Sequence, residues 1–111
     1  MNDRERALIG TLLGPMFPGR DELLEQMRTA KVRRVDQDGS LELLIISDIK
    51  ASHVRYVVPT EGEYRDPDGV TVHVLLHVVG DQAKELEFFR EDNGRVQTWP
   101  DPATVRVFAP E

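Results

Sequence analysis

The sequence predicts an α+β fold in which two N-terminal helices pack on an antiparallel β-meander of five or six strands. Apolar residues recur at helical spacing in residues 1–30, whereas residues 31–108 contain segments in which apolar and polar residues alternate. Turn motifs rich in Gly, Pro and Asp separate these alternating segments. The 111 residues fit a single domain, 1–111, with a helical part at 1–30 and an antiparallel sheet at 31–108.

The two helices are predicted in NDRERALIGTLLG and PGRDELLEQMRTA. Asn2 or Asp3 can cap the first helix, and Gly14-Pro15 ends it. Its predicted apolar stripe consists of Ala7, Leu8, Leu12 and Leu13. The stripe of the second helix consists of Leu23, Leu24, Met27 and Ala30.

The predicted strands follow in order along the chain. KVRRV and SLELLII flank the turn motif DQDG and predict a hairpin. HVRYVV alternates in the same way, and TEGEYRDPDG after it has the composition of a polar turn. VTVHVLLHVV, KELEFF and RVQTW are the next strands, and a short alternating piece contains Val105 and Val107.

The sequence also predicts the register between two of these strands, VTVHVLLHVV and KELEFF. A three-residue loop, 80–82, sets Leu76 opposite Leu86 and Val74 opposite Phe88, whereas a two- or four-residue loop sets Leu76 opposite a glutamate. The three-residue loop therefore places the apolar side chains of both strands on one face, against which the helices can pack. The other face carries the candidate contact residues His73, Leu75, His77, Glu85, Glu87 and Phe89.

This second face has two interpretations. Aliphatic and aromatic side chains among charges on the solvent side are typical of a contact surface, with His77 opposite Glu85 as a cross-strand pair. Alternatively, the C-terminal tail covers the face in part, and Trp99 folds over it. Trp99 is accordingly either a clamp for the tail or an exposed anchor for a partner.

Composition excludes several functional classes. The chain has no cysteine, which excludes disulfides, thiolate metal sites and cysteine nucleophiles. The net charge is −6, and residues 36–111 carry fifteen Asp/Glu against seven Lys/Arg. Such a surface repels phosphate backbones and attracts cationic partners. The run ALIGTLLGPMF is too short to span a bilayer, so we expect a cytoplasmic protein without membrane contact.

His73 and His77 raise the question of a metal site, because two histidines four residues apart on a helix can bind one zinc ion. The valine-rich segment around them predicts a strand instead, on which their Cα atoms are roughly 13 Å apart. Both rings cannot easily reach one ion from that distance. Without a Gly-x-Ser-x-Gly motif or a phosphate-binding loop, we expect no enzyme, no catalytic residues, no metal and no cofactor.

One local cluster is basic. RTAKVRR groups Arg28, Lys31, Arg33 and Arg34, which could touch phosphate. The cluster contains no aromatic residue, and the sequence that follows it is acidic, which argues against nucleic acid as a partner.

The segment DGVTVHVLLHVVGDQAKELEFFREDNGRV resembles a pattern in a group of small, uncharacterised bacterial domains. These run from a DG turn into a V-x-V strand and then through an ELE-aromatic-x-R segment to a second DG-type turn. The resemblance covers residues 66–102, and EDNG stands here where the group has a plain turn. It implies a small α+β domain and carries no catalytic residues over to this chain. Domains of this kind are associated with immunity or accessory roles in bacterial toxin systems.

The leading functional expectation is a small acidic protein-interaction module, of the immunity type, that neutralises a basic protein partner by occlusion. Glu85, Glu87, His77 and Phe89 are its expected contact centre. The first alternative is a small-molecule or metal-dependent enzyme that uses His73, His77 and nearby glutamates. The second is a structural homodimer formed through an edge strand.

Overall fold

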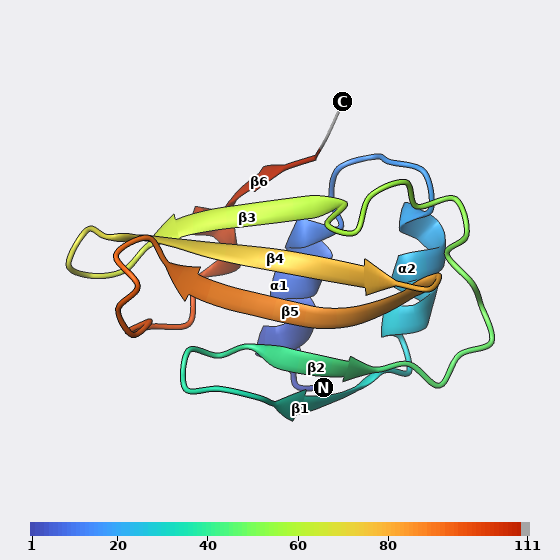
Figure 1. Ribbon diagram of the computed structural model, residues 1–111, viewed down its shortest axis with the longest axis horizontal. Helices are drawn as coiled ribbons and strands as arrows, with labels where there is room; N and C mark the ends of the chain where they lie inside the picture. Colours follow the sequence, from blue (N-terminus) through green and yellow to red (C-terminus); the bar gives the residue numbers. More distant parts are fainter. Residues whose placement is uncertain (110–111) are drawn as a thin grey trace.

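A computed structural model describes residues 1–109 and shows two helices on one side of a six-stranded antiparallel sheet (Figure 1). The predicted α+β fold, with both helices N-terminal, is confirmed. The helices are α1 (Asp3–Leu12) and α2 (Arg20–Met27), and a short 3₁₀ helix, η1, spans Pro102–Thr104. The strands are β1 (Lys31–Arg34), β2 (Leu41–Leu44), β3 (Thr60–Arg65), β4 (Thr71–Val79), β5 (Gln82–Arg90) and β6 (Arg106–Phe108).

The strands lie in the order β1-β2-β5-β4-β3-β6, and every neighbouring pair is antiparallel. Strands β3, β4 and β5 form a meander, in which each strand pairs with the next. Strand β2 lies beside β5, and β6 lies beside β3. The strand order therefore departs from chain order at these two places, and β1 and β6 are the edges of the sheet.

Helix α1 begins with a capping box. The side chain of Asn2 accepts a hydrogen bond from the backbone N–H of Glu5, and the carboxylate of Glu5 accepts one from the N–H of Asn2, both at 2.8 Å. These bonds satisfy two of the amide groups that a helix start leaves unpaired. The buried side of the helix consists of Leu8, Ile9 and Leu12, with Leu13 just after it, whereas Ala7 is exposed.

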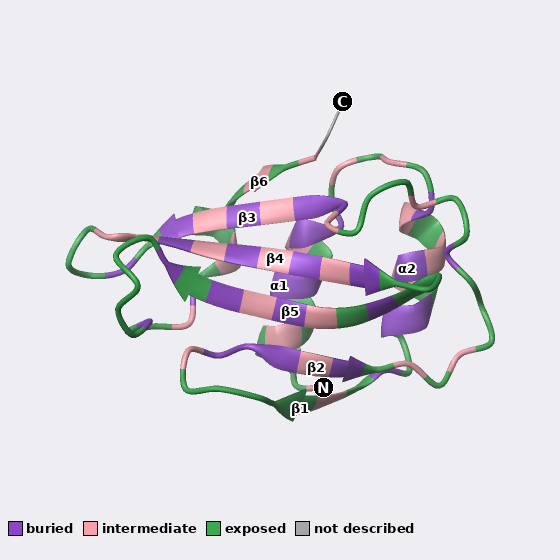
Figure 2. Ribbon diagram, viewed as in Figure 1, coloured by how far each residue is buried: buried purple, intermediate pink, exposed green. Residues whose placement is uncertain are grey.

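Burial alternates along the central strands, as Figure 2 shows by colour. The inward residues of β4 are nearly inaccessible: Val72, Val74 and Leu76 are 0% exposed. Leu86 and Phe88 of β5 pack beside them and join the same core as the buried helix residues. The core therefore lies between the sheet and the two helices, and no helix of the described residues lies over the opposite side of the sheet (Figure 1).

The predicted β4–β5 register is confirmed between residues 72–77 and 85–90, but the predicted three-residue loop is wrong. The chain turns on two residues, Gly80 and Asp81, whose φ angles are 56° and 68°. Two positive φ angles are typical of the tight turns that join twisted strands. A bulge at Lys84 shifts the register by one residue after this turn, and that shift restores the apolar pairing.

Three sequence assignments outside this hairpin are corrected. Thr60–Arg65, predicted as part of a polar turn, forms β3, while the turn itself is confined to residues 66–70. HVRYVV, predicted as a strand, lies within the irregular connection 45–59. Since β5 and β4 separate β2 from β3, this connection has to cross the sheet and cannot run along it. RVQTW is not a strand either.

RVQTW is held by a buried carboxylate and not by a neighbouring strand. Asp66 accepts hydrogen bonds from the backbone N–H groups of Gln97 and Thr98 at 3.0 and 3.2 Å. Arg90, which is 5% exposed, donates to the same carboxylate at 2.9 Å and also binds Asp68 and Asp92. These bonds fix the chain after β5 against the turn between β3 and β4.

Candidate functional site: the open face of the sheet

The side of the sheet opposite the helices carries a mixed acidic and apolar surface, which we call the open face. The outward side chains of β3, β4 and β5 form its centre. They are Glu61, Glu63, His73, Leu75, His77, Glu85, Glu87 and Phe89. The open face thus contains six of the seven candidate residues that the sequence indicated.

His73 lies in the middle of this surface and contacts three side chains. Its Nδ1 is 3.0 Å from Oε1 of Glu61, and its Nε2 is 2.8 Å from Oε1 of Glu91. The ring also stacks on Phe89, with the two centroids 4.9 Å apart. Both ring nitrogens can donate at the same time only when the imidazole carries two protons. His73 thereby connects β3, β4 and the residue that follows β5.

His77 makes a different contact from the one predicted. Its Cα partner across the strands is Glu85, as expected, but its Nε2 lies 2.9 Å from the carboxylate of Glu87, its diagonal neighbour. Diagonal neighbours lie within reach of long side chains in an antiparallel pair. Within residues 1–109, the side chain of Glu85 has no hydrogen-bond or ion-pair partner.

Glu85 lies between His77 on one side and Glu42 of β2 on the other. Two glutamates are therefore directly opposite each other on neighbouring strands. Glu42 is paired with Arg33 of β1, whose Nη2 lies 2.7 Å from its Oε2. At the far edge, Arg106 of β6 pairs with Glu63 at 3.3 Å. The acidic centre is thus flanked by one Arg–Glu pair at each edge of the sheet.

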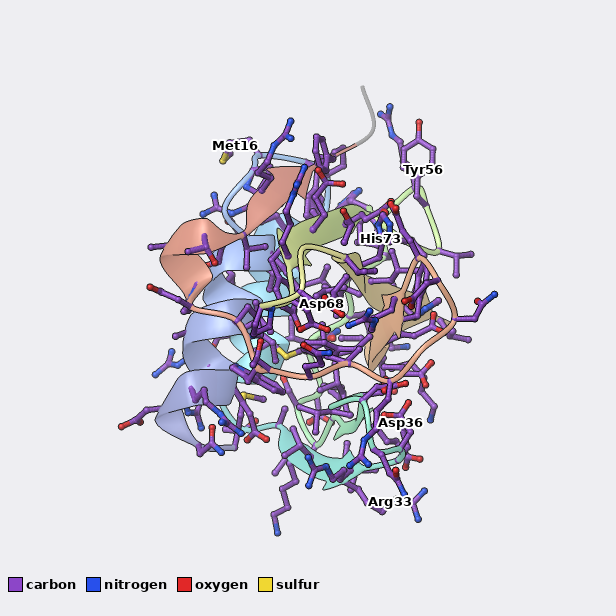
Figure 3. All side chains as sticks on the ribbon, turned by 90° about the vertical axis from the view of Figure 1, so that its left-hand side faces the viewer. Met16, Arg33, Asp36, Tyr56, Asp68 and His73 are labelled. Carbon is purple, nitrogen blue, oxygen red and sulfur yellow. The ribbon has the colours of Figure 1, made fainter. Side chains whose placement is uncertain are left out.

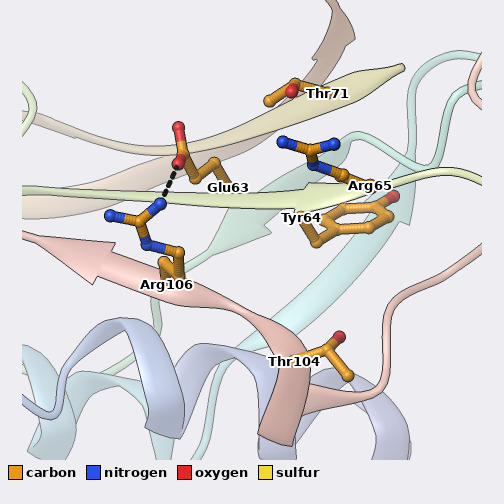
Figure 4. Close-up of a pocket in the computed structure, with 6 residues that line it drawn as sticks. All are labelled: Glu63, Tyr64, Arg65, Thr71, Thr104 and Arg106. Atoms are coloured by element: carbon orange, nitrogen blue, oxygen red, sulfur yellow. Dashed lines mark ion pairs between the residues drawn. The ribbon is translucent and has the colours of Figure 1, made fainter. Parts of the chain in front are cut away.

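A pocket of about 350 Å³ adjoins the Arg106 edge of the open face (Figure 4). The residues that line it are Glu63, Tyr64, Arg65, Thr71, Thr104 and Arg106. The Tyr64 hydroxyl donates to the carbonyl of Thr98 at 2.7 Å, and burial together with the nearby Asp66 raises the pKa of this phenol. Tyr64 is therefore a structural residue of the pocket wall and is not poised for proton transfer.

Trp99 is the one candidate residue that lies elsewhere. Its ring packs on Phe88, a core residue, with centroids 5.0 Å apart, and the guanidinium of Arg4 in α1 lies 4.8 Å from the ring centroid. Trp99 is therefore on the helix side of the sheet. The expectation that it folds over the histidine face is wrong, and its position is that of a clamp for the chain after β5.

Part of the open face is not evident from the sequence pattern. The turn predicted in TEGEYRDPDG contains Glu61 and Glu63, and nothing in the sequence connects Glu91 with His73. TEGEYR does alternate, but its inward positions are Thr60, Gly62 and Tyr64, of which only Tyr64 has a large apolar surface. The alternation of charge at Glu61, Glu63 and Arg65 was the signal that could have revealed the strand.

The histidines and glutamates of the open face form two separate clusters. Within residues 1–109, no group of three or more His, Asp or Glu residues is arranged to hold a metal ion. His73 is bound by Glu61 and Glu91, whereas His77 is bound by Glu87, so the two rings have separate partners. The arrangement suits ionic and apolar contacts with another molecule.

The part of the chain that the structure describes includes no helix with the length and apolar character needed to cross a membrane.

The fold and the open face define a small α+β domain whose sheet is covered by helices on one side and presents carboxylates and histidines on the other. The family model described as a domain of unknown function (DUF6984) matches residues 1–100, and the chain belongs to this family. The match spans both helices and the first five strands, and it therefore reaches far beyond the 66–102 segment that carries the resemblance to small bacterial domains. No curated protein and no solved structure matches the chain.

Proposed function

We propose that this protein is an interaction module that binds a basic protein through the open face. The observation that carries the proposal is the placement of Glu61, Glu63, Glu85 and Glu87 on the three central strands, on the side without helices. Such a surface attracts a cationic partner and orients it before contact. Leu75 and Phe89 lie among these carboxylates and supply apolar contact area at the centre.

The pairing of Glu42 with Glu85 supports the same proposal. Like charges directly opposite each other on neighbouring strands destabilise a sheet. Of these two glutamates, only Glu42 has a cationic partner within residues 1–109, which leaves Glu85 available to a cation from outside. A partner that places Lys or Arg over Glu85 removes this repulsion, so binding relieves a cost that the free protein carries.

The mechanism of the proposed module is occlusion. The open face covers the basic surface of the partner over the width of the three central strands. The partner can then no longer bind its own substrate or target with that surface. This is the mode of action of an immunity-type protein, and the resemblance to small bacterial domains associated with toxin systems points the same way. The proposed role needs no catalytic group.

The test begins with affinity capture from lysate of the source organism, treated with nuclease, at low and high salt, with the captured proteins identified by mass spectrometry. The partner is then purified, and its affinity is measured by calorimetry for the wild type and for Glu85→Lys. We expect the variant to weaken binding at least tenfold and to reduce its salt dependence, since surface charge pairs are screened by salt.

The matched control is Glu25→Lys, which makes the same change of charge at an exposed position of α2. This variant should bind as the wild type does. If both variants weaken binding equally, the effect arises from net charge and not from the open face. If neither variant changes the affinity, the partner binds elsewhere and the proposed function is wrong.

A further inference from the structure

The irregular connection 45–59 exposes an unusual amount of apolar surface. Irregular connections of this length are uncommon in compact domains and are frequently functional. Ile46 and Val57 are each 64% exposed, Tyr56 is 48% exposed and Ile49 is 43% exposed. Val79, at the end of β4, is 58% exposed. Exposed apolar side chains that gather in one region mark interaction sites, whereas scattered ones do not.

Hydrogen bonds bring this connection against the β4–β5 turn. The N–H of Val78 donates to the carbonyl of Val57 at 2.7 Å, and the N–H of Ala51 donates to the carbonyl of Asp81 at 2.9 Å. The buried amide of Gln26 donates to the carbonyls of both Ile49 and Asp81, at 2.9 and 2.8 Å. Segments that are distant in sequence thus form one surface, which we call the hairpin corner: Ile49, Arg55, Tyr56, Val57, Val79 and Asp81.

The hairpin corner has both a projection and a hollow. The hollow measures about 200 Å³, and Val54, Tyr56 and Val78 are among the residues that line it. The side chain of Tyr56 points away from the body of the molecule (Figure 3). A projecting apolar group next to a small hollow suits a contact between two identical surfaces, in which each copy fills the hollow of the other.

The charges of the corner are also suited to such a contact. Arg55 and Asp81 both line the hollow, yet they form no ion pair with each other within residues 1–109. In a two-fold symmetric contact, residue i of one copy meets residue j of the other, and the reverse contact forms as well. Arg55 of each copy can therefore pair with Asp81 of the other, which gives two ion pairs across one interface.

The rest of the molecule disfavours other modes of self-association. The net charge of the chain is −6, and at the centre of the open face Glu85 has no ion-pair partner within residues 1–109. Two copies that meet there repel each other. The hairpin corner combines apolar surface with one charge of each sign at its hollow.

We propose that a second copy of this chain docks on the hairpin corner, and that the protein is a two-fold symmetric homodimer held by Tyr56, Val57 and Val79 and by reciprocal Arg55–Asp81 pairs. The interface adjoins the turn end of the open face, because Val79 lies on the same side of β4 as His77. The inference does not depend on the function proposed for the open face.

The first experiment is analytical ultracentrifugation of the full chain over micromolar to millimolar concentration. We expect a dimer for the wild type and a monomer for Val57→Asp, with unchanged thermal unfolding of the monomer fold, because the Val57 side chain is largely exposed. The control is Met16→Asp, at a residue that is 78% exposed and lies on the other side of the molecule from Tyr56 (Figure 3). This variant should remain dimeric.

The second experiment is a charge swap. Arg55→Glu alone should weaken dimerisation at least tenfold, since it faces Asp81 of the other copy, and the double variant Arg55→Glu/Asp81→Lys should recover most of the loss. Asp81 has a φ of 68°, so the folded stability of the double variant is checked by thermal unfolding. A wild type that stays monomeric at millimolar concentration, a Val57→Asp variant that stays dimeric, or a folded double variant without recovery overturns the proposal.

Discussion

Glu42 and Glu85 are register partners on the neighbouring strands β2 and β5, and both carboxylates belong to the open side of the sheet. Arg33 compensates Glu42 alone. A pair of like charges in this position costs folding free energy, so its replacement allows the stability and the binding role of the open face to be measured separately.

We expect Glu85→Lys to stabilise the fold by about 0.2–1 kcal/mol, because a like-charge pair becomes an opposite-charge pair. The free energy of unfolding is measured by urea denaturation at low salt. The same variant is expected to bind a basic partner more weakly, so that stability and affinity change in opposite directions. Glu25→Lys, on α2, should not stabilise, because it replaces the acid that pairs with Arg28. A destabilised Glu85→Lys would contradict this account of the face.

Gln26 is the polar residue that ties α2 to the hairpin corner. It is 0% exposed, and its carbonyl accepts the N–H of Ala83 at 3.0 Å. Gln26→Leu leaves that buried N–H without an acceptor, which should cost roughly 1–3 kcal/mol of unfolding free energy. Chemical denaturation measures the loss, and hydrogen exchange should show faster exchange at Ala83. Gln82→Leu, at an exposed position nearby, should change neither quantity.

Arg90 should control the acid stability of the protein. Its hydrogen bonds lower the pKa of Asp92 to about 2, and they also lower the pKa of Asp68. A carboxyl whose pKa is depressed in the folded state contributes stability above its unfolded pKa of about 4 and loses that contribution as the pH falls to the folded value. The melting temperature should therefore decrease as the pH is lowered from about 4 to about 2.

Arg90→Gln should lower the melting temperature at neutral pH, because the buried Asp66 loses its cation, and should make the midpoint less sensitive to pH in that acidic window. Arg95→Gln is the control, since Arg95 is exposed and is in no ion pair within the described residues. An acid unfolding curve that is identical in Arg90→Gln and the wild type would show that other carboxyls dominate.

Alanine substitution at two glycines should change the free energy of unfolding in opposite directions. A Cβ atom at Gly62 would lie 2.8 Å from side-chain carbons of both Leu12 and Val105, so Gly62→Ala overpacks the contact between α1 and β3 and should cost about 1–3 kcal/mol. Gly10, inside α1, has no atom within 4 Å of such a Cβ, and Gly10→Ala should stabilise by about 0.5–1 kcal/mol. Thermal unfolding of both variants tests the pair, and equal shifts would contradict the packing argument.

The β4–β5 hairpin shows how far the sequence alone reaches. Both strands are nine residues long, and the apolar and polar positions of β4 alternate with few exceptions. A one-residue slip would expose the whole apolar set, so the pattern itself determines the register and the residues of each face. The six open-face candidates follow from this local information. The bulge at Lys84 does not, because a two-residue turn with a bulge and a three-residue loop give the same pairing beyond it.

Contacts between distant residues decided the remaining features. Thr60–Arg65 has weak strand propensity and becomes β3 because β4 offers an edge and Gly62 lets α1 approach closely. HVRYVV has stronger propensity but lies in the connection that must cross from β2 to β3. The partners of His73 likewise come from residues twelve and eighteen positions away.

The sequence by itself determined the helices, the alternation of the long hairpin and the acidic character of the sheet, because periodicity and charge are local properties. Only the tertiary structure decided which segments are strands at the edges, which carboxylates surround His73, and that Trp99 packs on the helix side against Phe88. The physical reason is that a strand, an ion pair or a packed ring is stabilised by a partner, and the position of that partner depends on the strand order of the whole sheet.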